Sequence, residues 1–311
     1  MMTDIDLVYT YVDGSDPVWM AKRDATIGNP GGTQEHCAGR YADHDELKYS
    51  LRSVERYAPW IRRIFIVTDN QVPAWLDTTN DRVQIVDHTD IMPARCLPCF
   101  NSVVIEHHLH RIDGLSERFI YANDDMLINR PIGPEFFFAD DGLPIVHLNR
   151  RVLRKLTLWL REHVQHKPLD AYVLTIKRAA ALVEARYGIY FGDKTHHNMD
   201  AYLKSSYAHT RQVFDTEISA TLANHARSDT DIQRNIYSYV PLAEGKAHKR
   251  YVDQHTSFRF HIDNPAHYDK FRRYNPTLFC MNDSQFATDA HRERAAQFLH
   301  ALFPNKSSFE N

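Results

Sequence analysis

The chain has 311 residues, of which 43% are hydrophobic and 25% charged, so it can bury a core, and a globally disordered chain is excluded. Lysine and arginine total 37 and aspartate and glutamate total 40, and this near balance lacks the basic excess of a nucleic-acid-binding protein. Because no apolar run reaches about 18 residues and the N-terminus is acidic, we expect a cytoplasmic protein without a transmembrane helix or signal peptide.

Strand and helix signals alternate along the first half of the chain. β-Branched and aromatic runs predict strands, and apolar residues at helical spacing predict helices between them. This alternation favours an α/β fold with a mostly parallel, Rossmann-like sheet and helices on both faces. The predicted strands cover residues 7–12, 63–68, 83–86 and 119–121, and the predicted helices lie around 47–54 and 105–112, the second capped by Ser102 and ended at Gly114.

Each predicted strand runs directly into an acidic residue. Ligands of open α/β sheets bind beyond the carboxyl ends of the strands, where these side chains are expected to meet. A single aspartate at a strand end is most often only a helix cap or a turn residue. Acids at four strand ends, with a pair at the last, favour a metal-bridged polyanionic ligand. These acids are Asp13, Asp69, Asp87 and the pair Asp124–Asp125.

Residues 150–190 differ in character, because basic residues there accompany apolar ones at helical spacing. The pattern predicts a basic helical insertion that separates a nucleotide-sugar-binding half, residues 1–149, from the rest of the catalytic domain, residues 191–311. Its charges either form a solvated helix face or offer a landing surface to an anionic acceptor. Short strands are expected at 251–252 and 257–260, and a terminal helix at 290–302.

Two strand-end motifs indicate a nucleotide-sugar site. The sequence Asn123-Asp124-Asp125 follows an apolar strand and resembles the metal-binding acidic motif of nucleotide-sugar transferases, in which carboxylates hold Mg²⁺ against a diphosphate. In the earlier motif, residues 13–16, Gly14 permits a tight turn whose backbone N–H groups and Ser15 hydroxyl are suited to cradle a uridine or a phosphate. A plain turn is the alternative for each motif.

A third cluster, Glu106, His107 and His110, lies in the second predicted helix. The H-x-x-H spacing lacks the form of the H-E-x-x-H zinc motif, so we favour Glu106 as a general base over a zinc site. Further along, the pair His196–His197 can exchange protons near neutral pH, and Arg227 presents a planar fork suited to phosphate oxygens.

The four cysteines are expected to be reduced thiols. Cys96 and Cys99 form one C-x-x-C, while Cys37 and Cys280 stand alone. A structural zinc site would need a second such pair, and disulfides are rare in the cytoplasm.

Taken together, these motifs resemble the Stealth family of capsular polysaccharide phosphotransferases, which includes the catalytic subunit of the animal lysosomal-enzyme GlcNAc-1-phosphotransferase. The resemblance extends over nearly the whole chain in four blocks. The second block is the longest and the most specific. The blocks are residues 6–17, residues 40–125, the stretch around 196–205, and residues 227–310.

The resemblance implies a glycosyltransferase-A-like fold and transfer of a sugar-1-phosphate, most simply of an N-acetylhexosamine, from a UDP-sugar to a sugar hydroxyl of an anionic polysaccharide or oligosaccharide. UMP would be released, with Mg²⁺ or Mn²⁺ as the cofactor. Peripheral association with a capsule assembly complex at the inner membrane face is also implied. The implied catalytic residues are Glu106, Asp125, His197 and Arg227; the substrate-binding residues are Asp13, Gly14, Ser15, Asp16, Asn70, Asn101, Asn123 and Asn282; and the metal ligands are Asp124, Asp125 and Asp283.

Two other functions fit parts of the pattern. A metal-dependent glycosyltransferase would transfer the sugar alone and release UDP, and composition cannot separate it from a phosphotransferase. A non-catalytic carbohydrate-binding module would not need carboxylates at four strand ends. The sequence leaves open whether the donor is UDP-GlcNAc or UDP-ManNAc, and whether the block-three histidine is His196 or His197.

Overall fold

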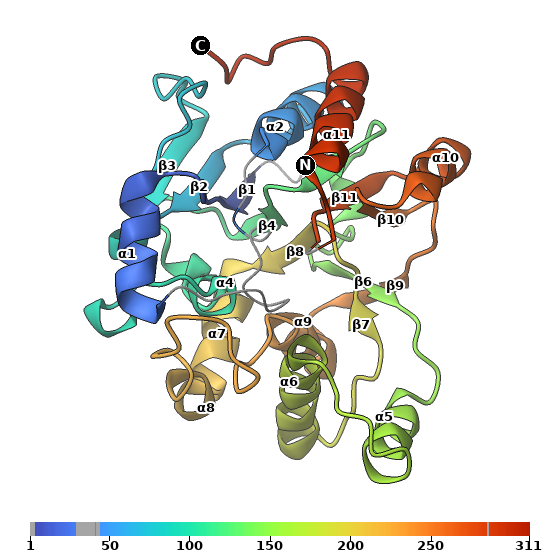
Figure 1. Cartoon of the computed structure of the whole chain (residues 1–311). Helices are drawn as coiled ribbons and strands as arrows, with labels where there is room; N and C mark the ends of the chain where they lie inside the picture. The colour runs from blue at the N-terminus through green and yellow to red at the C-terminus, as the bar shows by residue number, and fades with distance from the viewer. Residues whose placement is uncertain (1–3, 29–40, 42–43, 285) are drawn as a thin grey trace.

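A five-stranded sheet in the order β3-β2-β1-β4-β8 forms the centre of the molecule (Figure 1). The structure, a computed structural model, describes residues 4–28, 41, 44–284 and 286–311, so Cys37 and Arg40 lie outside the described residues. Four strands run parallel and β8 is antiparallel to β4, which confirms an α/β fold with a mostly parallel sheet. The strands are β1 (Ile5–Thr10), β2 (Ile64–Thr68), β3 (Val83–Asp87), β4 (Arg118–Asn123) and β8 (Asp200–Leu203).

Helices cover both faces of this sheet, as the apolar runs of its central strands require. On one face, Leu7 and Ile64 pack against α2 (Glu46–Tyr57), whose Leu51 is fully buried. On the opposite face, Val8 and Phe65 belong to a second core. That core is covered by α4 (Ser102–Glu106), α6 (Ala171–Tyr187), α7 (Lys204–Val213) and α9 (Ile236–Ala243).

Two three-stranded sheets flank the central one. The first has the order β10-β11-β5 and forms a third core with α10 and α11; the second has the order β7-β6-β9 (Figure 1). The expected terminal helix is therefore present as α11. The elements are β5 (Met126–Ile128), β6 (Ile145–Asn149), β7 (Lys194–Thr195), β9 (His248–Tyr251), β10 (Ser257–His261), β11 (Leu278–Asn282), α10 (Pro265–Tyr274) and α11 (Asp289–Leu302).

The expected helix over residues 105–112 is wrong in its extent. The α-helix α4 ends at Glu106, and a separate 3-10 turn, η3 (Leu109–Arg111), follows it. Its cap is also Asn101 rather than Ser102, because the Asn101 side chain accepts the Val103 N–H at 3.1 Å. The remaining elements are α1 (Pro17–Ile27), α3 (His88–Ile91), α8 (Asp215–Ser219), η2 (Ala94–Cys96) and η4 (Pro134–Phe136).

The strand register places the predicted acidic residues along one edge of the sheet. Thr10 lies opposite Asn123, and Thr68 lies opposite Asp87, so the parallel strands end together. The simple cap interpretation holds for Asp87, which forms a capping box at the start of α3. Asp69 pairs with Lys22 at 2.5 Å. The carboxylates of Asp69 and Asp87 are therefore both engaged within the protein.

The insertion, residues 150–190, contains α5 (Arg154–His163) and α6, which lie on the side of the sheet opposite α2 and α11 (Figure 1). Helix α6 packs against α9 and contributes Ala179 and Val183 to the core. Helix α5 buries only Leu158. Within the described part of the chain, no helix has the length and apolarity needed to cross a bilayer.

A buried ion pair attaches the C-terminal segment to α2. Arg52 donates from Nε and Nη2 to the two carboxylate oxygens of Glu310, at 2.7 and 2.6 Å, and its Nη1 donates to the Phe303 carbonyl. The two side chains are 9% and 3% exposed. The pair therefore fixes the C-terminal segment to α2 in the interior of the protein, although the two residues are 258 positions apart.

Replacing Glu310 by Ala should destabilise the fold strongly, because it leaves the Arg52 charge buried without its partner. We expect the free energy of unfolding, measured by urea denaturation, to fall by about 3–5 kcal/mol. Arg56 lies one turn further along α2 and is exposed; it donates to the Leu302 carbonyl at 3.3 Å, and its guanidinium lies 5.0 Å from the centroid of the Tyr57 ring. Arg56→Ala is the control and should change stability by less than about 0.5 kcal/mol; equal losses in the two variants would contradict the prediction.

Candidate active site

Glu106 lies at the end of α4, beneath the carboxyl ends of β1 and β4, and is only 6% exposed. The Tyr121 hydroxyl lies 3.1 Å from Glu106 Oε1, 2.8 Å from Thr10 Oγ1 and 2.8 Å from Asn123 Oδ1. Tyr121 therefore connects the carboxylate to the ends of two central strands. Asn123, predicted to bind substrate, is part of this cluster.

A buried arginine that the sequence analysis missed lies beside Glu106. Arg234 Nε is 3.4 Å from Glu106 Oε2, and Arg234 Nη2 is 3.2 Å from Asp200 Oδ2. Its guanidinium also lies over the Tyr121 ring, 4.1 Å from the centroid. The sequence signal for Arg234 was weak, because its direct neighbours Gln233 and Asn235 are polar, although Ile232 and Ile236 on either side of them are buried.

Opposing effects set the protonation of Glu106. Burial raises the pKa of its carboxyl group, whereas the Arg234 charge, the Tyr121 hydroxyl and the Arg227 charge lower it. The net shift is upward, so Glu106 holds a proton more tightly than an exposed glutamate and is a stronger base when ionised. This is the behaviour expected of the predicted general base.

Arg227 is held close to this carboxylate by an ordered loop. Its Nη2 donates to the Ser102 hydroxyl at 2.9 Å, at the start of the helix that carries Glu106. Asn101 anchors the same loop, because its Nδ2 donates to the Ala226 carbonyl at 3.1 Å and to Asp231 Oδ2 at 2.9 Å. Asn101 is fully buried and its side chain holds this loop in place, and its contact with substrate stays a prediction.

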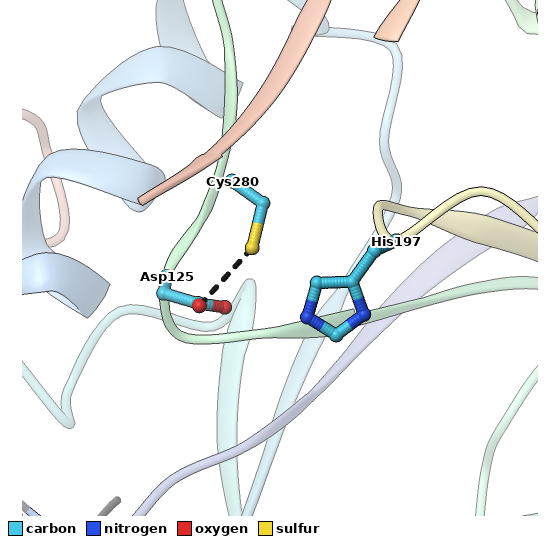
Figure 2. Close-up of side chains that lie close together, drawn as sticks. All are labelled: Asp125, His197 and Cys280. Carbon is cyan, nitrogen blue, oxygen red and sulfur yellow. Dashed lines mark hydrogen bonds between the residues drawn. The ribbon is translucent and has the colours of Figure 1, made fainter. Parts of the chain in front are cut away.

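Asp125, His197 and Cys280 meet at the other side of the sheet edge (Figure 2). One ligand atom of each lies within 4.8 Å of the others, and no other such group occurs among the described residues. The Cys280 thiol donates to Asp125 Oδ2 at 3.1 Å, and Asn282 Nδ2 donates to the Cys280 sulfur at 2.7 Å. The structure thus brings His197 to Asp125 and adds Cys280, which the sequence analysis treated only as an isolated thiol.

The donor atoms of this group differ in their preference for metals. Mg²⁺ favours oxygen and is commonly held by one or two carboxylates together with substrate phosphates, so Asp125 fits it. The imidazole of His197 and the sulfur of Cys280 suit softer cations. Asp283, another predicted ligand, accepts instead from Arg292 Nε at 2.7 Å, and Asp124 accepts from the Asp125 N–H at 3.0 Å.

The turn after β1 adopts the predicted tight geometry. Asp13 Oδ1 accepts from the Ser15 N–H at 2.8 Å, and Asp16 accepts from the Val18 N–H and caps α1. Gly14 is required, because a Cβ there would lie 2.2 Å from the Tyr41 carbonyl oxygen. Substrate binding by Asp13, Gly14, Ser15 and Asp16 stays a prediction.

Asn70 and Asn282 are placed differently at the same edge. Asn70 is exposed, has a φ of 55°, and donates its N–H to Asp87 Oδ2 at 2.6 Å. Asn282 Oδ1 accepts from Arg259 Nε at 2.8 Å. Contact of either residue with substrate stays a prediction.

The other histidines of the predicted motifs, His196, His107 and His110, are buried or partly buried. His196 is 2% exposed and its Nε2 lies 2.9 Å from the Met199 carbonyl oxygen, so His197 is the better placed of the pair. His107 is also buried and contacts the Tyr237 hydroxyl at 2.8 Å. Burial lowers the pKa of His107 to about 3 and that of His110 to about 4, and neither joins a metal-binding group among the described residues.

A partly enclosed lysine carries positive charge into the same region. Lys194 Nζ lies over the Tyr172 ring, 4.3 Å from its centroid. Burial, followed by the charges of Arg259, Arg151 and Arg154, lowers the pKa of Lys194 to about 8. Among the described residues, no carboxylate forms an ion pair with this amine, so its charge and those of the nearby arginines favour an anion there.

The reduced-thiol prediction is confirmed for the three described cysteines. Cys96, Cys99 and Cys280 are free and buried. Burial raises the pKa of Cys99 to about 12, so that thiol is inert in the native protein.

Comparison with known proteins identifies relatives along almost the whole chain. Residues 40–146 match the model of Stealth protein CR2, conserved region 2, and residues 3–31 match that of Stealth protein CR1, conserved region 1. A capsular polysaccharide phosphotransferase of Actinobacillus suis is 32% identical over 97% of this chain and 83% of its own length. The exopolysaccharide phosphotransferases SCO2592 and SCO6023 of Streptomyces coelicolor are 35% and 34% identical over 98% of this chain, which spans only 33% and 52% of their lengths.

Among solved structures, the galactosyltransferase LgtC in complex with donor and acceptor sugar analogs is similar at 11% identity. The match has a TM-score of 0.47 and covers 97% of this chain and 96% of the other.

A comparison of divalent cations should show whether the nitrogen of His197 and the sulfur of Cys280 bind a metal together with the Asp125 oxygen. In the metal-free protein without substrate, we expect Co²⁺ to bind more tightly than Mg²⁺, with absorption from a cobalt–sulfur bond, because Co²⁺ accepts nitrogen and sulfur donors. Cys280→Ser should weaken Co²⁺ binding by about 10–100-fold in a calorimetric titration and remove that absorption. The buried thiol of Cys96 is the control. A spectrum that Cys96→Ser abolishes and Cys280→Ser preserves would contradict the assignment.

Proposed function

Because the chain belongs to the Stealth family, we propose that it is a phosphotransferase that moves a sugar-1-phosphate from a UDP-sugar to a sugar hydroxyl of a polysaccharide acceptor and releases UMP. An N-acetylhexosamine is the proposed sugar. The reaction would serve capsule or exopolysaccharide synthesis, in keeping with the names of the relatives.

One observation supports this proposal: a buried carboxylate, Glu106, pairs with Arg234 and lies on the same short helix as Ser102, to which Arg227 donates. Phosphoryl transfer needs positioned positive charge around the transferring phosphate more than it needs covalent chemistry. In the proposal, Arg227 supplies a planar fork for phosphate oxygens, and Glu106 supplies a base for the attacking hydroxyl.

In the proposed reaction the acceptor hydroxyl attacks the β-phosphorus of the donor. Glu106 takes the hydroxyl proton, a new P–O bond forms to the acceptor, and the bond between the β-phosphorus and the bridging oxygen of UMP breaks. Arg227 stabilises the negative charge on the transferring phosphate. His197, which lies next to Asp125, would give a proton to the departing phosphate oxygen.

Mg²⁺, or Mn²⁺ in its place, is the proposed cofactor and would be held by Asp125. When bound, it would offset the charge of the donor diphosphate. Residues 13–16 and Asn123 are proposed to contact the UDP-sugar donor, since residues 13–16 follow β1 and Asn123 ends the adjacent strand β4. Lys194 and Arg259 add positive charge on the insertion side, where an anionic acceptor would approach.

The nucleotide product should separate the proposed reaction from ordinary glycosyl transfer. With a panel of UDP-sugars and a polysaccharide acceptor, UMP should accumulate, because attack falls on phosphorus rather than on the anomeric carbon. Asp125→Asn should reduce turnover to background while the circular dichroism spectrum stays native, since an amide holds the cation poorly. Accumulation of UDP would indicate a glycosyltransferase, and full activity of the folded Asp125→Asn variant would remove that residue from the site.

Replacing Arg227 by Lys should test whether the guanidinium fork matters or only its charge. A lysine is a point charge that cannot bind two phosphate oxygens side by side. We expect kcat/KM for UMP release to fall on the order of 10²-fold, or roughly 2.7 kcal/mol. Arg178, at the surface of α6, contacts only the Asp229 carbonyl at 3.4 Å, so Arg178→Lys is the control. A loss below about threefold would place Arg227 outside the transition-state contacts.

A further inference from the structure

Helix α5 exposes an apolar surface that no described part of the chain covers. Leu158 is 5% exposed and holds the helix to the protein, but residues on its other side project into solvent. This set, named here the α5 stripe, consists of Val152 (70% exposed), Leu153 (66%), Leu156 (49%), Trp159 (50%), Leu160 (36%) and Val164 (58%).

The spacing of these residues makes the α5 stripe continuous. At 3.6 residues per turn, Leu156, Trp159, Leu160 and Val164 fall within an arc of about 140°, and Leu158 lies on the opposite side. Val152 and Leu153 come just before the first turn of α5. Exposed apolar residues scattered singly need no explanation, whereas a contiguous set indicates an interaction surface. At the periphery of the molecule, α5 is well placed for such a contact (Figure 1).

Positive charge flanks the α5 stripe. Between residues 150 and 167 the chain has six basic residues and one acidic residue, Glu162, and that acid is paired with Lys177 at 2.5 Å. The basic residues are Arg150, Arg151, Arg154, Lys155, Arg161 and Lys167. Only Lys155 among them forms an ion pair with a described carboxylate, that of Glu184.

We propose that α5 binds the surface of an anionic lipid bilayer, with the α5 stripe among the acyl chains and the basic residues at the headgroups. A short helix with leucine and tryptophan on one side and arginine on its flanks is typical of helices that lie in the membrane interface. A purely apolar partner would leave the flanking charges unmatched, while an anionic lipid surface matches both features. This inference concerns a surface apart from the site, so it does not depend on the proposed function.

Vesicle binding tests the inference with the intact protein and without any sugar donor. Sedimentation with vesicles of phosphatidylcholine containing about 30% phosphatidylglycerol should pull down the wild-type protein, whereas pure phosphatidylcholine should not. High salt should weaken the binding, because it screens the charges. The fluorescence of Trp159 should shift to shorter wavelength as its half-exposed ring leaves water. Absence of binding to the anionic vesicles would overturn the inference.

Two sets of variants locate the contact. Leu156→Ser combined with Trp159→Ser should reduce the affinity for anionic vesicles by at least about tenfold, and Arg150→Gln with Arg151→Gln should remove most of the dependence on anionic lipid. All four side chains are exposed, so folding should be unaffected, which circular dichroism would check. The control is Val18→Ser with Val72→Ser, two residues that are 77% and 55% exposed elsewhere.

The remaining outcomes are decisive against the inference. Equal binding by the stripe variant and the control would show that another surface contacts lipid. A dimer in gel filtration that the stripe variant dissociates, with no vesicle binding, would assign the α5 stripe to contact between two copies of the chain.

Discussion

The buried guanidinium of Arg234 is the interaction on which the geometry of the site depends. It lies between Glu106 and Asp200 and over the ring of Tyr121, and all of these groups are nearly excluded from water. A buried charge is tolerated only when its partners are close, because its desolvation costs several kcal/mol. The arginine therefore requires α4, β4 and β8 to stay together, and through them it fixes the position of the carboxylate.

The antiparallel direction of β8 explains how residues from the second half of the chain reach the same edge. A strand that runs antiparallel to β4 begins where β4 ends, so the residues just before β8 lie beside the carboxyl ends of the parallel strands. His197 enters the site from that segment, and Asp200 is the first residue of the strand. The parallel half supplies Asp125, and the small sheet with β11 supplies Cys280.

Local patterns predicted the parallel half well, because its strands are buried on both faces and its helices are amphipathic. The predicted strands 83–86 and 119–121 end within two residues of the observed ends at Asp87 and Asn123, and the patterns also place Asp125 at this edge. The break of the helix after Glu106 was not predictable from apolar spacing, since Leu109 stays buried in the 3-10 turn that follows. Nor could one sequence show that Arg234, which is 128 positions after Glu106, is its partner.

The two ends of the predicted insertion, residues 150–190, lie side by side. Residues 148 and 149 of β6 pair with residues 195 and 194 of β7. Next to this pairing, the Arg151 N–H donates to Asp193 Oδ1 at 2.7 Å. A segment whose two ends lie together can change in length at small entropic cost to the rest of the fold. That freedom belongs to α5, which buries only Leu158, whereas α6 is held in the core through Ala179 and Val183.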